Sequence, residues 1–139
     1  MAVRRWRERI RDILNAVAEV EVFTQGMTGD QFLLDHKTIR AVELNFIIIG
    51  EATSQVPDDV QGRFPEVPWR IMKAMRNRLV HVYFDADPRI VWETIVNDLP
   101  PLVVPLRRLL AENPERPADE PLSEPPSQVD VRGERDETK

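Results

Sequence analysis

The amino-acid sequence predicts an all-α protein, an up-and-down bundle of four to five helices followed by a disordered C-terminal tail. Up to about residue 112, apolar residues recur at spacings of three and four, as on helices that bury one face. The breaks between these periodic segments are short, which favours antiparallel neighbours. From residue 113 onward, prolines and acidic residues replace the large apolar ones, and such a segment cannot offset its ordering entropy by burial. We therefore expect a helical domain over residues 1–112 and a tail over residues 113–139.

The first two helices follow from apolar stripes separated by glycines. The first helix is expected over about residues 3–24, with a buried stripe of Trp6, Ile10, Ile13, Leu14, Val17 and Val20. Gly26 and Gly29 end it, and Thr28 or Asp30 can cap a second helix. The core positions of this second helix are Ile39, Val42, Phe46 and Ile49. Gly50 within it costs about 1 kcal/mol relative to alanine, which indicates that another helix approaches closely there.

Prolines mark the remaining boundaries. They predict a loop over 57–68, a third helix over 69–84, a fourth that begins at 87–88, and a short fifth over 102–110. On the fourth helix we expect Val91, Ile95 and Leu99 to face inward, and Pro105 is a candidate bend in the fifth.

Composition narrows the possible chemistry. The chain has 139 residues, a formal net charge of −5, no cysteine and only two histidines. Disulfides, thiolate metal sites and cysteine nucleophiles are therefore excluded, and no group of residues resembles a metal or cofactor site. No apolar run approaches the roughly 20 residues of a membrane helix, and the N-terminus does not look like a signal peptide. We expect a soluble, cytoplasmic protein that needs no cofactor.

The third helix carries the residues best suited to chemistry, Arg76, Asn77, His81 and Tyr83. At ~100° per residue they lie opposite the expected core stripe. That stripe consists of Ile71, Met72, Met75, Leu79 and Val82. A polar arc is usually a solvated helix face. Here an apolar residue, Val80, lies within it, and histidine exchanges protons near neutral pH. The sequence therefore predicts that something outside the bundle contacts this arc.

The run from Arg76 to Tyr83 resembles the signature of the HEPN superfamily, and more narrowly that of the HepT-like toxins of prokaryotic HEPN–minimal nucleotidyltransferase modules. The histidine stands five positions after the arginine, an asparagine follows the arginine, and a tyrosine closes the run. The similarity extends to residues 50–52, 68–69 and 91–95 and covers about residues 1–112.

This resemblance implies a metal-independent endoribonuclease that works as a homodimer on an RNA substrate. Cleavage through the 2′-hydroxyl needs a base, an acid and a positive group for the phosphorane charge, and one chain offers one well-placed histidine. A two-fold axis through the exposed arc would bring two copies of His81 and Arg76 together. His81 would then transfer protons and Arg76 would hold the scissile phosphate. Asn77 would orient one or the other.

The resemblance also implies regulation at Tyr83. In toxins with this extended motif, a partner nucleotidyltransferase antitoxin adds AMP to the tyrosine and silences the nuclease. The added bulk and negative charge beside Arg76 would compete with the RNA phosphate. The alternative is a non-catalytic HEPN module that binds nucleotide or a protein partner. We favour the nuclease, because such a module is expected to have lost Arg76 or His81.

Other candidates have structural alternatives. The Glu51 carboxylate could orient His81 or Arg76, or simply form an ion pair. Five arginines between positions 4 and 11 could bind RNA phosphates, although the polar side of an amphipathic helix is the more common role for such residues. Trp6 and Trp69 are expected to anchor the core.

Overall fold

The computed structural model describes residues 5–85 and 87–112, except for the side chains of 78–85. All regular secondary structure in these residues is helical, which confirms the all-α prediction. The elements are α1 (Trp6–Thr24), α2 (Gly29–Leu34), α3 (His36–Ser54), α4 (Asp58–Arg63), α5 (Trp69–Asp85), α6 (Pro88–Glu93), the π-helix η2 (Thr94–Asp98), the 3₁₀ helix η3 (Pro100–Leu102) and α7 (Val103–Ala111). The expected tail over residues 113–139 lies outside the described residues.

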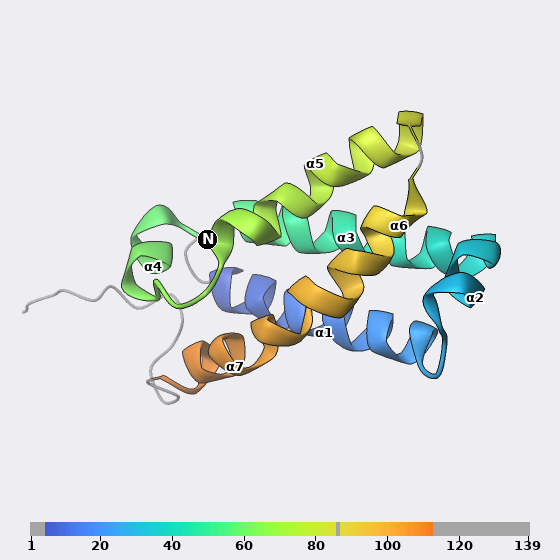
Figure 1. Ribbon diagram of the computed structural model, residues 1–139. Helices are drawn as coiled ribbons and strands as arrows, with labels where there is room; N and C mark the ends of the chain where they lie inside the picture. Colours follow the sequence, from blue (N-terminus) through green and yellow to red (C-terminus); the bar gives the residue numbers. More distant parts are fainter. Residues whose placement is uncertain (1–4, 86, 113–139) are drawn as a thin grey trace, which may run out of the picture.

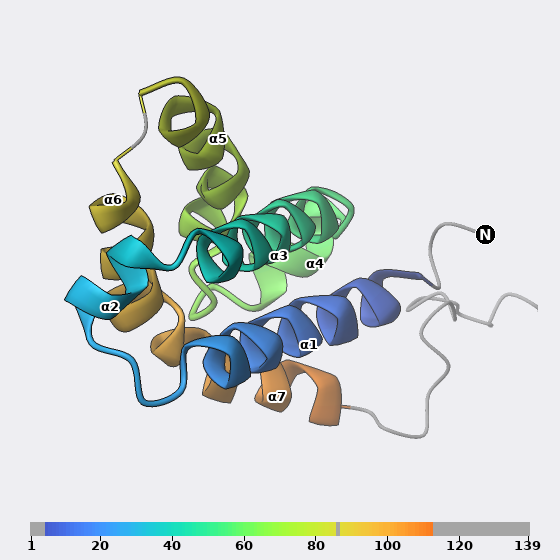
Figure 2. The ribbon, with the colours of Figure 1, turned by 90° about the vertical axis from the view of Figure 1, so that its right-hand side faces the viewer.

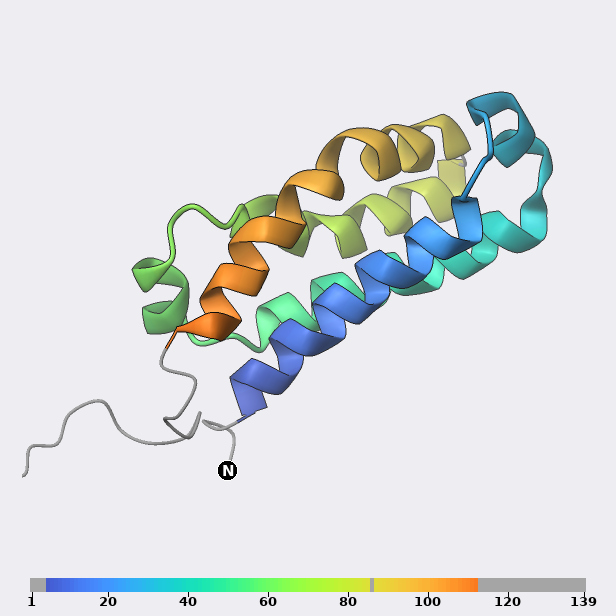
Figure 3. The ribbon, with the colours of Figure 1, turned by 90° about the horizontal axis from the view of Figure 1, so that it is seen from below.

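The long helices run up and down, as expected, with α3 at the centre of the arrangement (Figure 1). Helix α3 packs against α1 on one side and α5 on the other, and the view along the bundle shows it between them (Figure 2). The C-terminal part of the domain closes the bundle through four consecutive elements, α6, η2, η3 and α7. Helix α7 lies beside the first half of α1 (Figure 3). None of the described helices has the length and apolar character to cross a membrane.

The core draws on nearly every element. Its largest fully buried side chains are Phe32, Phe46, Ile10, Ile13, Ile49, Met72, Met75, Leu99, Leu102, Leu106, Leu109 and Val17. Trp6 and Trp69 are buried, as predicted. The Trp69 indole N–H donates to the carbonyls of Gln61 and Phe64, each at 3.1 Å, so that its one polar atom is satisfied inside the protein.

The predicted second helix is in fact two helices that meet at Asp35. Thr28 caps α2 through a capping box with Gln31, as one of the two expected caps. The Asp35 carboxylate then caps α3, accepting from the Thr38 backbone N–H at 3.0 Å and from the Thr38 hydroxyl at 2.8 Å. These hydrogen bonds, the backbone one first, hold the pKa of Asp35 below its ordinary value. The cap allows the chain to turn so that α2 docks on α6, with Phe32 and Trp92 ring centroids 5.2 Å apart.

Two further expectations need correction. The expected loop over 57–68 contains the short helix α4, which buries Val60. Ile71, expected in the core, is 37% exposed, because it lies at the edge of the buried face of α5 rather than at its centre. Pro105 lies in the first turn of α7, where a backbone N–H would lack an intrahelical partner in any case.

A polar contact ties the first helix to the last. The Arg7 guanidinium donates to the Leu110 carbonyl at the end of α7, and it lies 5.5 Å from the Trp6 ring centroid. Burial, with a contribution from the charge of Arg11, lowers the pKa of Arg7. Nearby, Arg9 pairs with Asp12 at 3.1 Å. Two of the clustered arginines, Arg7 and Arg9, thus have partners within the chain.

Candidate active site between α3 and α5

The site begins with a close approach of two helices. Gly50 is buried on α3, and a Cβ placed there would come within 2.6 Å of the Arg76 Cβ and 3.1 Å of the Arg76 backbone nitrogen. Real Cβ atoms essentially never show a contact as short as 2.6 Å, so only glycine allows α5 to lie this near to α3 without a shift of the backbone. The close helix approach predicted from Gly50 is therefore confirmed, and the residue brought closest is Arg76.

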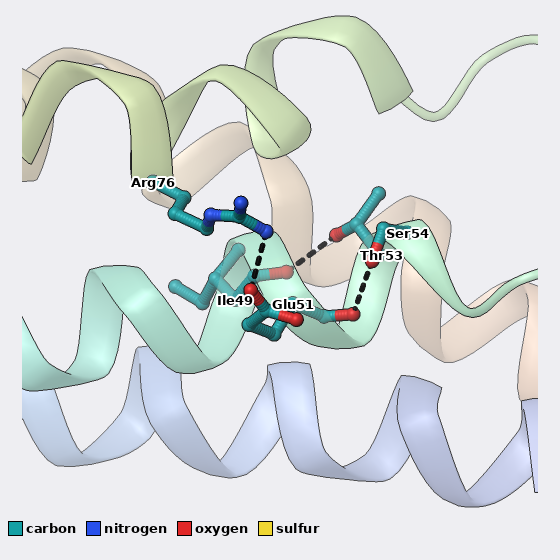
Figure 4. A network of polar contacts seen from close by, with 5 residues as sticks. All are labelled: Ile49, Glu51, Thr53, Ser54 and Arg76. Atoms are coloured by element: carbon teal, nitrogen blue, oxygen red, sulfur yellow. Dashed lines mark hydrogen bonds and ion pairs between the residues drawn. The ribbon is translucent and has the colours of Figure 1, made fainter. Parts of the chain in front are cut away.

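From this contact, the Arg76 side chain reaches along α3 to Glu51 (Figure 4). The guanidinium and the carboxylate form a hydrogen-bonded ion pair, with the two side chains 50% and 48% exposed. Arg76 therefore does not simply point away from its own bundle, as the helical wheel of α5 predicted. Its base is packed against α3, and its charged end lies at the open edge between the two helices.

The position of this pair decides what it can do. An ion pair exposed to this degree adds at most about 1 kcal/mol to stability, so it does not explain the arrangement by stability alone. A guanidinium presents five donors in a fixed fork that fits a phosphate as well as a carboxylate. Arg76 is thus held in place and remains accessible to an anionic ligand from solvent.

The turn of α3 that follows Gly50 is also tightly bonded. The Thr53 hydroxyl donates to the Ile49 carbonyl and the Ser54 hydroxyl to the Glu51 carbonyl, both at 2.7 Å (Figure 4). These bonds occupy carbonyl groups near the helix end. The Ser54 hydroxyl thereby satisfies the Glu51 carbonyl, one of the last four of α3, which lack partners within a regular helix.

The remaining predicted site residues lie further along α5. Asn77 is exposed and directly follows Arg76. The backbone of α5 stays helical through Asp85, so residue 81 stands one turn beyond Asn77 and residue 83 about two turns beyond Arg76. The side chains of His81 and Tyr83 lie outside the described residues. The structure thus brings together Arg76 and Glu51 among the predicted residues.

The outward face of α3 holds residues that the sequence analysis overlooked. Leu44, Ile47 and Ile48 are 58%, 41% and 37% exposed, respectively, and they directly precede the turn that carries Glu51. A signal for them exists in the sequence. They stand at relative positions i, i+3 and i+4 on the side opposite the predicted core stripe, so α3 is apolar on two faces, which is unusual for a surface helix.

Comparison with known proteins shows which family the chain resembles. The family description "Ribonuclease HepT-like" matches residues 13–109. A protein of Thermococcus cleftensis named "Probable ribonuclease HepT" is 41% identical over 96 residues, which cover 69% of this chain and 87% of that protein. A protein of Methanocaldococcus jannaschii that carries an RNase name is 38% identical over 94 residues, covering 68% of this chain and 78% of the relative.

A further relative, from Caldanaerobacter subterraneus subsp. tengcongensis and also named as an RNase, is 34% identical over 86 residues, covering 62% of this chain and 77% of the relative. No solved structure matches the chain. The family match spans α3, α5 and the contact between them, including Gly50, Glu51 and the run from Arg76 to Tyr83. The chain therefore belongs to the HepT-like ribonuclease family of the HEPN superfamily.

Proposed function

We propose that this protein is a metal-independent endoribonuclease whose active site is completed by a second copy of the chain. The observation that carries the proposal is the placement of Arg76. Its guanidinium is half exposed and held by Glu51 at the open edge between α3 and α5. On the same helix stands His81, in a chain that belongs to a ribonuclease family.

The reaction follows from these groups. His81 of one chain accepts the proton of the ribose 2′-hydroxyl, and the 2′-oxygen attacks the adjacent phosphorus. Arg76 stabilises the negative charge that develops on the phosphorane oxygens. The bond from phosphorus to the 5′-oxygen then breaks, and that oxygen takes a proton from His81 of the second chain. The products are a 2′,3′-cyclic phosphate and a free 5′-hydroxyl. One histidine gains the proton of the 2′-hydroxyl and the other loses one to the 5′-oxygen, so the protons balance.

Glu51 serves in this scheme as a positioning residue. Its carboxylate keeps the long Arg76 side chain in one orientation and so reduces the entropy lost when a phosphate binds. The incoming phosphate takes over the donors of the guanidinium fork, since phosphate and carboxylate bind it with similar geometry. Asn77, exposed beside Arg76, orients the phosphate or His81.

RNA cleavage in the presence of a chelator tests the proposal. Purified protein is incubated with a pool of RNA in excess EDTA, and the 3′ ends of the fragments are analysed. We expect cleavage to persist and the fragments to end in cyclic phosphate. Loss of activity in EDTA with recovery on adding a divalent cation would contradict the metal-independent mechanism. Absence of cleavage for every RNA class would favour the non-catalytic alternative.

We also propose that the protein is the toxin of a cytoplasmic toxin–antitoxin pair, silenced when a nucleotidyltransferase antitoxin modifies Tyr83. The Tyr83 oxygen attacks the α-phosphorus of ATP, forming the tyrosyl-AMP bond and releasing pyrophosphate. Position 83 stands about two helical turns from Arg76 on the same stripe of α5, and the attached phosphate competes with RNA for the guanidinium.

Intact-mass measurement after incubation with the antitoxin and ATP checks this modification. We expect the native chain to gain the mass of AMP and to lose RNA cleavage. Tyr83→Phe, which lacks only the nucleophilic oxygen, should keep both its mass and its activity. An equal mass gain in Tyr83→Phe would place the modification on another residue.

A further inference from the structure

The outward face of α3 carries an exposed apolar patch in an unusual position. At ~100° per residue, Leu44, Ile47 and Ile48 lie opposite the buried stripe of the same helix. Each is more than a third exposed. Single exposed aliphatic residues are ordinary on a protein surface. Three of them at positions i, i+3 and i+4 lie side by side on one helix face, and such an apolar stripe is suited to binding another helix.

Charged residues stand on both ends of this patch, with opposite signs. Arg40, 71% exposed at the side chain, precedes it by one turn, and Glu51, 48% exposed, follows it by about one turn. Arg40 contacts Glu43 of its own helix at 3.2 Å, and a guanidinium has further donors to offer. Along its outward face, α3 thus presents a basic residue, an apolar centre and an acidic residue.

This order is self-complementary under a two-fold axis. When two copies of α3 meet antiparallel with the axis level with residues 45–46, Leu44 faces Ile48 of the second copy. Arg40 then faces Glu51 of the second copy, and the same contacts recur on the other side of the axis. A helix with like charges at both ends of the patch would lack this property.

The same axis also suits the candidate active site. Helix α5 runs antiparallel to α3 (Figure 1) and meets it where Arg76 lies on Gly50. Because both helices rise ~1.5 Å per residue, positions 80–81 of α5 come level with positions 45–46 of α3. An axis level with residues 45–46 of α3 is therefore also level with positions 80–81 of α5.

We propose that the face of α3 formed by Arg40, Leu44, Ile47, Ile48 and Glu51 is where a second copy of this chain binds. This inference rests on the homodimer of the proposed function. It specifies which surface the two copies share and which residues of the two α3 helices face each other. In that register, Arg40 of the second copy approaches Glu51 and shares its carboxylate with Arg76. Dimer formation thereby loosens the hold of Glu51 on Arg76 and makes more of the guanidinium available to RNA phosphate.

Ile47→Glu tests the surface through the oligomeric state. A carboxylate near the two-fold axis meets its own symmetry copy in an apolar contact, so we expect the dimer dissociation constant to rise by about two orders of magnitude or more. The molecular mass by light scattering should fall to that of a monomer, with the helical circular dichroism unchanged because the residue is exposed. Leu34→Glu is the matched control, since Leu34 is 84% exposed on α2 and should leave the mass of the dimer unchanged.

The register is tested by charge exchange and by cross-linking. Arg40→Glu should weaken the dimer because it places two acids opposite each other. Adding Glu51→Lys should restore it. The native chain has no cysteine, so Ile47→Cys provides a single thiol near the axis. It should form a disulfide-linked dimer on mild oxidation, whereas Leu34→Cys should not.

The outcomes separate this inference from the proposed function. A dimeric Ile47→Glu variant, or an Ile47→Cys variant that does not cross-link, would overturn the assigned surface while leaving the nuclease proposal intact. A monomeric Ile47→Glu variant that still cuts RNA would support the surface and contradict the composite active site. A native chain that is monomeric at all tested concentrations would overturn both the surface and the composite site.

Discussion

His81→Ala and Arg76→Ala are each expected to slow RNA cleavage by about 10²–10⁴-fold while the protein remains folded. Removing His81 takes away the group that accepts and returns protons. Removing Arg76 leaves the developing phosphorane charge without its cation. Arg76 is half exposed and its ion pair with Glu51 contributes little to stability, so its loss should not unfold the bundle. Initial rates on a defined RNA, with circular dichroism on the same samples, check both statements.

Matched variants show whether the effect belongs to the site. Arg70→Ala removes an exposed arginine from the same helix outside the motif and should cut RNA at the native rate. Arg76→Lys keeps the charge but loses the planar fork, so its rate should lie between those of the native chain and Arg76→Ala. Glu51→Gln should impair cleavage less than Arg76→Ala, because it only loosens the orientation of Arg76. Native rates in both alanine variants would refute the catalytic assignment.

Gly50→Leu is expected to destabilise the protein by about 1–3 kcal/mol, the usual cost of overpacking. Any side chain at this position meets the Arg76 Cβ and backbone, neither of which can rotate away. Leucine favours helix by nearly 1 kcal/mol over glycine, so a loss of stability must come from the contact with α5. The separation of α3 and α5 should also displace Arg76 and reduce RNA cleavage, although no predicted catalytic residue has changed.

Gly62→Ala is the control for this prediction. Gly62 lies in α4, and a Cβ there would meet nothing within 4 Å. The gain in helix propensity should therefore appear without a clash, as an increase of up to about 1 kcal/mol. Thermal unfolding followed by circular dichroism compares the two variants. A Gly50→Leu protein as stable as the native one would show that α3 and α5 do not approach each other at Arg76 in solution.

Periodicity in the sequence was enough to predict the fold because each long helix has one apolar stripe. Periodicity did not predict the turn between α2 and α3, where the chain changes direction at Asp35. Phe32 and Ile39 stand about two helical turns apart on either side of Asp35, so their apolar positions share one register. The end of α2 and the start of α3 therefore read as one helix. The carboxylate cap on Thr38 was the only local signal for the break. Ile71 was misplaced because a helical wheel gives the centre of a buried face but not its width, which depends on the neighbouring helices.

The sequence was enough to predict which residues belong to the candidate site, but it predicted only some of the contacts between them. Gly50 indicated a close helix approach, and the structure confirms it with Arg76 as the neighbour. Glu51 had two possible partners in the sequence, Arg76 and His81. The ion pair with Arg76 depends on where α5 crosses α3, which local sequence does not encode. The apolar patch on the outer face of α3 was not predicted, because a buried stripe specifies which side of a helix faces the core and assigns no role to apolar residues on the other side.

The contact between Arg7 and Leu110 joins residues 103 positions apart, with a consequence for how the protein is made. Helix α1 emerges from the ribosome before the other described helices, yet one of its packing partners, α7, is the last of them to be translated. The bundle cannot close until α7 has left the exit tunnel, and contacts of such long sequence separation form late in folding. Premature termination before residue 103 would leave the apolar side of α1 uncovered and the chain prone to degradation. A nascent chain of this protein thus stays incompletely folded until nearly the whole helical domain has been synthesised.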